Sequence, residues 1–154
     1  MQKRYYAAYG SNLNIQQMKQ RCPSARTIGT STIPDYELLF KGNHRGAYLT
    51  IEARLDAEVP VGIWEVDPEA EMALDQYEDY PTLYYKKEMI LPVHEFASGG
   101  IKDRPVFVYI MDESHPLAMP SREYIEICLV GYEDFNFDGS YIYIAINQYK
   151  KSVK

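Results

Sequence analysis

Several short segments of the chain have the composition and alternation of β-strands, and helices do not separate them regularly. The segments cover residues 4–9, 25–32, 36–41, 47–54, 61–66, 83–93 and 106–111. Turn-forming residues bound them, for example at Pro34-Asp35. A parallel sheet needs a crossover helix between successive strands. The irregular order therefore favours the α+β class, with an antiparallel or mixed sheet of about six or seven strands that can curl into a small barrel.

About three or four short helices are expected at the periphery of this sheet, because helix start and stop signals occur between and after the strands. Their spans run from Asn12 or Asn14 to Pro23, from Asp67-Pro68 to Glu78-Asp79, onward from Ser121, and over 141–149, where alternating Tyr and Ile also fit a strand.

The composition is that of one soluble domain over residues 1–154, with 46 % hydrophobic and 25 % charged residues. No window approaches the roughly 18 consecutive apolar residues of a membrane span, and a cytoplasmic protein is expected. Because 16 Lys and Arg face 22 Asp and Glu, the net charge is −6. That charge argues against nucleic acid as a partner.

The metal-ligating and nucleophilic residue types show no recognisable spacing. Cys22 and Cys128 lie far apart without a CxxC pattern, which favours idle buried thiols over a disulfide or a zinc site. His44, His94 and His115 share no metal-binding spacing. No serine lies in a Gly-x-Ser-x-Gly elbow. Neither a metal nor a covalent nucleophile is therefore indicated.

The first candidate functional segment is Tyr9-Gly10-Ser11-Asn12-Leu13, a glycine turn between a strand and a helix. Such a loop presents successive backbone N–H groups to one point, and the helix that follows adds partial positive charge. The segment can hold a carboxylate or a phosphate group, although an ordinary tight turn has the same pattern. Neither a dinucleotide-binding fingerprint nor a P-loop is present.

The second candidate is the acidic end of the helix that begins at Asp67-Pro68, where Glu78 and Asp79 follow Leu74-Asp75. Negative side chains at a helix C-terminus oppose the helix dipole, so local stability disfavours them there. A partly desolvated Glu78 would have a raised pKa suited to proton transfer. A solvated acidic helix end is the alternative interpretation.

These two segments, taken with three others in the same order, resemble the γ-glutamylcyclotransferase-like family, which includes the AIG2-like proteins. The others are Gly46-Ala47-Tyr48-Leu49-Thr50-Ile51, Val61-Gly62-Ile63-Trp64-Glu65-Val66 and Pro120-Ser121-x-x-Tyr124. The similarity extends over residues 5 to about 132. Two departures are that Asp79 stands where the family usually has Gly, and that the last 20 residues match no family segment clearly.

The resemblance implies a small mixed α/β barrel and no cofactor or metal. It implies that Glu78 is the catalytic acid/base. It also implies a substrate-binding role for a set of residues that comprises Tyr9, Gly10, Ser11, Asn12, Leu13, Tyr85 and Tyr124.

The implied reaction releases 5-oxoproline when the α-amine of a γ-glutamyl group attacks its own γ-carbonyl, so the substrate brings the nucleophile and the protein supplies a base. The expected partner is thus a small γ-glutamyl compound, without nucleic acid or membrane. The leaving amine stays open, and the 42–46 and 95–105 loops are expected to select it.

Two other interpretations stay open at this stage. A non-catalytic module could bind a small acidic metabolite in the same pocket, although a carboxylate pointing into that pocket would favour catalysis. Alternatively, the 15 tyrosines could form an oligomer interface, and monomer or homodimer is not decided. We expect Tyr77 and Tyr80 to shape the surroundings of Glu78, and Tyr48, Tyr84 and Tyr109 to pack within strands.

Overall fold

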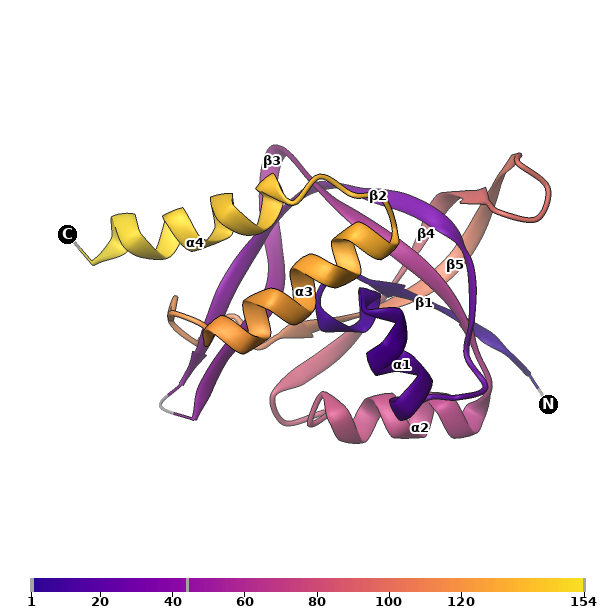
Figure 1. The fold of residues 1–154 in the computed structure, drawn as a ribbon, viewed down its shortest axis with the longest axis horizontal. Helices are drawn as coiled ribbons and strands as arrows, with labels where there is room; N and C mark the ends of the chain where they lie inside the picture. The colour runs from indigo at the N-terminus through magenta and orange to yellow at the C-terminus, as the bar shows by residue number, and fades with distance from the viewer. Residues whose placement is uncertain (1, 44, 154) are drawn as a thin grey trace.

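The computed structural model describes residues 2–43 and 45–153. Five strands and four α-helices follow one another along the chain, with one turn of 3₁₀ helix (η1) after the first strand (Figure 1). Their order and bounds are β1 (Arg4–Ala8), η1 (Ser11–Leu13), α1 (Ile15–Arg21), β2 (Arg26–Asn43), β3 (Gly46–Val66), α2 (Pro68–Tyr77), β4 (Tyr84–Glu95), β5 (Ile101–Met111), α3 (Arg122–Asp134) and α4 (Ser140–Ser152).

The strands form a closed barrel in the order β1-β3-β2-β4-β5. β1 completes it, because it pairs antiparallel with β3 and parallel with β5. All other neighbours are antiparallel. The sequence-based prediction of an α+β fold with a small mixed barrel is therefore confirmed.

The strand count is lower than expected because two pairs of predicted strands are each continuous. Segments 25–32 and 36–41 belong to β2, which bends at a register shift between Pro34 and Tyr36. Segments 47–54 and 61–66 belong to β3. Turn-forming residues here mark an irregularity within a long hairpin and not the end of a strand.

Closure of the barrel depends on a close approach between β2 and β4. Gly29 pairs with Glu95 and Thr30 with His94 at this seam. A Cβ atom at Gly29 would lie 2.1 Å from the backbone oxygen of His94. Only a residue without a side chain fits there.

The helices begin where the capping signals placed them. The side chains of Asn14, Asp67 and Ser121 accept hydrogen bonds from backbone N–H groups in the first turns of α1, α2 and α3. The segment predicted over 141–149 is also helical, within α4.

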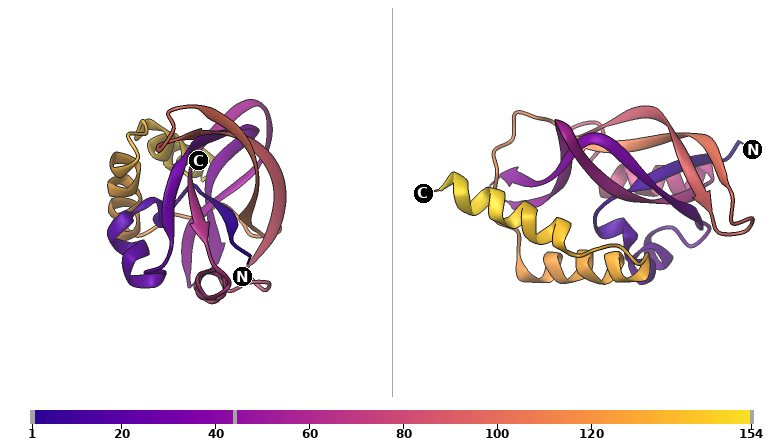
Figure 2. Two further views of the ribbon diagram at one scale, coloured as in Figure 1. Left: turned by 90° about the vertical axis from the view of Figure 1, so that its right-hand side faces the viewer. Right: turned by 90° about the horizontal axis from the view of Figure 1, so that it is seen from above.

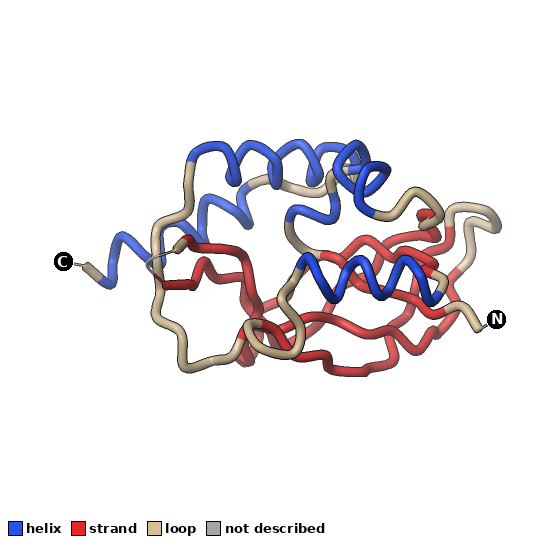
Figure 3. The backbone as a smooth tube through the Cα atoms, turned by 90° about the horizontal axis from the view of Figure 1, so that it is seen from below, coloured by secondary structure: helices blue, strands red, loops and turns tan. Residues whose placement is uncertain are grey.

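The helices cover two sides of the barrel. α2, the lowest helix in Figure 1, lies across the strands when the molecule is seen from below (Figure 3). η1, α1, α3 and α4 gather on another side (Figure 2), where α3 contacts both η1 and α4. No helix in the described ranges is both long enough and apolar enough to cross a bilayer.

We expect Gly29→Ala to lower the free energy of unfolding by roughly 2 kcal/mol or more, because the added methyl group collides with backbone that cannot move aside. Gly100→Ala is the matched control. Its Cβ would lie 3.6 Å from the Ser98 hydroxyl, an ordinary contact. Denaturant unfolding of both variants measures the difference, and equal stability would contradict the steric argument.

Candidate active site

A cavity of about 520 Å³ opens between the segment Tyr9–Leu13, called the first loop below, the end of α2 and the β2–β3 turn. Tyrosines form much of its wall. The described lining residues are Tyr6, Tyr9, Gly10, Ser11, Asn12, Gly42, Asn43, Arg45, Gly46, Tyr48, Leu49, Tyr77, Glu78, Asp79, Thr82, Leu83, Tyr84, His115 and Tyr124. Both segments singled out in the sequence therefore meet in one cavity, although they are more than 60 residues apart.

Side chains from other elements donate hydrogen bonds to the backbone carbonyls of the first loop. The hydroxyl of Tyr132 donates to the carbonyl of Tyr9 at 3.1 Å, and the indole N–H of Trp64 donates to the carbonyl of Asn12 at 3.0 Å. α3 packs directly on the end of the loop at Gly131, where a Cβ would lie 2.6 Å from the Asn14 nitrogen. Contacts from α3 and β3 therefore hold this loop in place.

Three backbone N–H groups of this loop are available to a ligand. Those of Gly10, Ser11 and Asn12 have no hydrogen-bond acceptor among the residues that the structure describes. The first N–H groups of a helical turn have no partner within that turn. The three residues line the cavity, so their N–H groups suit a carboxylate or a developing oxyanion.

Glu78 lies at the C-terminal end of α2 and lines the same cavity. Its N–H donates to the carbonyl of Leu74 at 2.9 Å, so the helix backbone places it. Asp79, which follows, has a φ of 53°, the left-handed conformation that favours glycine after a helix. The chain therefore keeps the turn expected for glycine, although aspartate stands there.

Burial raises the pKa of Glu78 from its ordinary 4.5 to about 8, and the nearby Arg21 guanidinium partly opposes this effect. The residue is half-buried, and it lines the cavity. Its carboxyl group has no hydrogen-bond partner in residues 2–43 and 45–153. An acid with this pKa exchanges a proton readily near neutral pH.

Arg21, which the sequence did not single out, contacts both the first loop and the end of α2. Its guanidinium lies 3.4 Å from the ring centroid of Tyr77 and donates to the side-chain oxygen of Asn12. The hydroxyls of Tyr77 and Ser11 share a hydrogen bond of 3.1 Å. These contacts connect the first loop to the end of α2.

Three tyrosine hydroxyls at the cavity wall are bound to backbone groups. The hydroxyl of Tyr84 donates to the carbonyl of Leu49 at 2.8 Å, and the N–H of Leu49 donates to the hydroxyl of Tyr124 at 3.1 Å. The hydroxyl of Tyr9 donates to the carbonyl of Tyr109 at 2.6 Å. Burial holds the pKa of Tyr9, Tyr84 and Tyr124 well above the ordinary value, so these hydroxyls stay neutral.

The structure places two predicted substrate-binding residues outside the cavity. Successive strand residues point to opposite sides, and Tyr84 faces inward. Tyr85 therefore faces outward, where its hydroxyl donates to Glu113 at 2.5 Å. Leu13 is fully buried in the core beneath the loop. The alternation of the strand could have selected Tyr84 in place of Tyr85.

Other tyrosine assignments also change. Tyr48, predicted to pack within a strand, lines the cavity and packs edge-on against Tyr124. Tyr77 lines the cavity as expected. Tyr80 does not line it, because its ring packs against Tyr109 and the ammonium of Lys86.

Of the two loops expected to select the leaving amine, one borders the cavity. Gly42, Asn43, Arg45 and Gly46 line it, whereas His44 lies outside the described residues. No residue of 95–105 lines it. The β4–β5 turn projects from the end of the barrel away from the β2–β3 turn (Figure 1). The expectation that the 95–105 loop borders the same site is therefore wrong.

The described residues contain no group of three His, Cys, Asp or Glu side chains that could hold a metal ion. Cys22 and Cys128 are both buried and free, and burial raises the pKa of Cys22 to about 11 and that of Cys128 to about 12. Neither thiol has the character of a reactive nucleophile.

Comparison with known proteins places these features in a family. A family model described as gamma-glutamyl cyclotransferase, AIG2-like, matches residues 6–126, which confirms the resemblance predicted from the motifs. No curated protein matched the chain.

Solved structures share the fold. A protein described as gamma-glutamyl cyclotransferase has a TM-score of 0.78 at 23 % identity, covering 97 % of this chain and 87 % of that chain. An uncharacterized protein from Homo sapiens has the same TM-score and identity over 97 % and 88 %. YkqA from Bacillus subtilis has a TM-score of 0.76 at 13 % identity over 96 % of this chain and 55 % of its own.

The raised pKa of Glu78 predicts a pH-dependent difference in stability between the protein and Glu78→Gln. Between pH 4.5 and about 8 the native carboxyl group keeps a proton that the unfolded chain has lost, so native stability falls as the pH rises. Glutamine has no such proton. The variant should therefore gain stability relative to the wild type across this interval, by roughly 2–4 kcal/mol above pH 8.

Chemical denaturation at a series of pH values measures this difference. The control is Glu126→Gln, at an exposed position in α3, whose stability should follow that of the wild type. A constant difference between wild type and Glu78→Gln from pH 4.5 to 8 would show that the carboxyl group is not desolvated.

Proposed function

Since the chain belongs to the AIG2-like γ-glutamyl cyclotransferase family, we propose that it is a cyclotransferase that releases 5-oxoproline from a small γ-glutamyl compound. The substrate's α-amine attacks its own γ-carbonyl carbon, the ring C–N bond forms, and the former amide C–N bond breaks to release an amine or amino acid. Atoms balance without water or a cofactor.

One observation carries this proposal. The unpartnered carboxyl group of Glu78 and the three unpartnered N–H groups of Gly10, Ser11 and Asn12 belong to a single cavity. Intramolecular acyl transfer requires a base that removes a proton from the substrate ammonium group, so that the amine can attack. It also requires hydrogen-bond donors that stabilise the negative charge on the carbonyl oxygen. The cavity holds both kinds of group and a rigid wall to bend the substrate.

The pKa of Glu78 suits both proton transfers. A carboxyl group with a pKa of about 8 accepts a proton from the substrate ammonium group more readily than an ordinary carboxylate does, because the two pKa values lie closer together. The protonated carboxyl group then donates to the leaving nitrogen as the amide bond breaks. Glu78 therefore serves first as general base and then as general acid.

The leaving amine is assigned to the outer part of the cavity. Asn43 and Arg45 from the β2–β3 turn lie there together with His115. The segment that carries His115 is fixed along β2, where the N–H of Gly42 donates to the carbonyl of Pro116 at 3.1 Å. The glutamyl group occupies the inner part between the first loop and Glu78.

A non-catalytic module for an acidic metabolite is the alternative. Whenever Glu78 loses its proton, its carboxylate would weaken the binding of an anion beside it, because like charges repel, so a module that only binds an anion gains nothing from this residue. The position of Glu78 within the cavity favours catalysis over this alternative.

Glu78→Gln should lower the rate of 5-oxoproline release by roughly two orders of magnitude or more, because the amide keeps the size of the side chain and removes the base. Assays with glutathione, γ-glutamyl dipeptides and γ-glutamyl amines measure the rate. Glu69→Gln, at an exposed position on the same helix, is the matched control and should keep full activity.

Retained activity in Glu78→Gln would exclude Glu78 as the acid/base. If the wild-type protein releases 5-oxoproline from none of these compounds but binds one of them, the binding module is the correct interpretation.

A further inference from the structure

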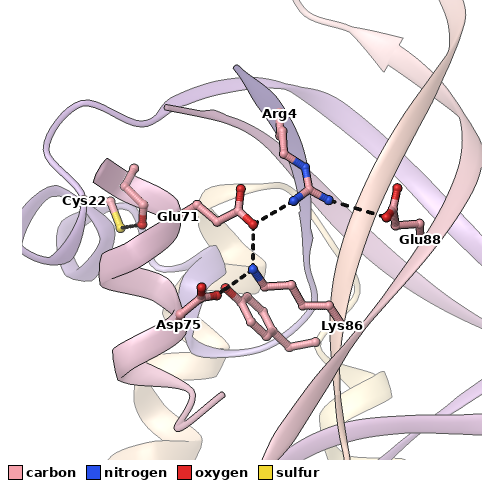
Figure 4. A network of polar contacts seen from close by, with 8 residues as sticks. Arg4, Cys22, Glu71, Asp75, Lys86 and Glu88 are labelled. Carbon is pink, nitrogen blue, oxygen red and sulfur yellow. Dashed lines mark hydrogen bonds and ion pairs between the residues drawn. The ribbon is translucent and has the colours of Figure 1, made fainter. Parts of the chain in front are cut away.

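A polar cluster outside the cavity joins α2 to the barrel. The ammonium group of Lys86, from β4, lies 2.6 Å from Glu71 Oε2 and 2.8 Å from Asp75 Oδ1 (Figure 4). Arg4, from β1, contacts the same Glu71 oxygen at 2.8 Å and reaches Glu88 at 3.9 Å. Glu71 and Asp75, both from α2, thus contact one ammonium group.

Three aromatic rings also lie close to this ammonium group. It lies 4.5 Å from the ring centroid of Tyr80, 5.2 Å from that of Phe107 and 5.7 Å from that of Tyr109. Burial acts to lower the pKa of Lys86, but the hydrogen bonds to Asp75 and Glu71 outweigh burial and raise it. Lys86 therefore stays charged and its geometry is restricted.

The cluster is connected to both halves of the active site. Tyr109, which pairs with Lys86 across the sheet, donates its hydroxyl to Asp75 Oδ1 at 2.6 Å. The backbone carbonyl of Tyr109 accepts the hydroxyl of Tyr9, which lines the cavity. The backbone carbonyl of Asp75 accepts the N–H of Tyr80 at 2.9 Å, which closes the turn that contains Glu78.

Glu78 depends on this anchorage because no described side chain holds its carboxyl group. We propose that Lys86 is a positioning residue. Its ion pairs with Asp75 and Glu71 fix the last turn of α2, and that turn sets the direction of the Glu78 carboxyl group. This inference rests on the proposed role of Glu78 as the acid/base. Lys86 itself does not line the cavity.

The test replaces Lys86 by methionine, which keeps the length of the side chain and removes its charge. We expect kcat per folded molecule to fall about 10-fold or more with KM nearly unchanged, because misplacement by about 1 Å has effects of this size while the glutamyl-binding loop is intact. Lys87→Met, at the exposed neighbouring position, should match the wild type. Lys86→Arg should recover part of the rate, because it restores the charge.

A second readout does not depend on turnover. In protein labelled with ¹³C at glutamate carboxyl carbons, the Glu78 signal should titrate near pH 8 in the wild type and in Lys87→Met. In Lys86→Met a carboxyl group that swings toward solvent should titrate lower by about one pH unit or more. Asp75→Asn, which keeps the shape of the contact, should give the same shift and serves if Lys86→Met does not fold.

The outcomes separate the two proposals. If the wild type releases no 5-oxoproline from any γ-glutamyl compound, the proposed function fails, and the titration alone decides whether Lys86 positions Glu78. If kcat per folded molecule and the Glu78 titration are both unchanged in Lys86→Met and Asp75→Asn, the positioning role is overturned and the cluster serves stability only.

Discussion

The desolvated carboxyl group of Glu78 is the constraint on which the rest of the site depends. Partial removal of a carboxyl group from water disfavours its charged form, which raises the pKa of Glu78. Such a group persists only where its surroundings cannot relax around it. The last turn of α2, anchored through Asp75, and the first loop, bound by Arg21 at Asn12, supply those surroundings.

Six of the 15 tyrosines line the same cavity. Phenol groups let a wall be apolar toward the cavity while each hydroxyl binds a backbone group of a neighbouring strand. Tyr9, Tyr84 and Tyr124 all do so, on β5 and β3. These three hydroxyls are therefore held by backbone groups and stay neutral, which limits the polar groups that they offer to water around Glu78.

Local rules predicted the elements and the loop that meets Glu78, because caps, turns and alternation depend on neighbouring residues. They did not predict that β2 continues through Pro34, since only pairing with β3 keeps that bend within one strand. The family resemblance selected Tyr85, whereas its neighbour Tyr84 is the residue that lines the cavity. Arg21 and Lys86 were missed because their partners lie on elements that only the barrel brings together.

Trp64 adds an optical consequence to its hydrogen bond with the first loop. It is the only tryptophan in the chain. Its indole N–H donates to the carbonyl of Asn12, a residue that lines the cavity. The tryptophan fluorescence of this protein, excited at wavelengths that tyrosine does not absorb, therefore originates beside the first loop and reports on changes in that loop.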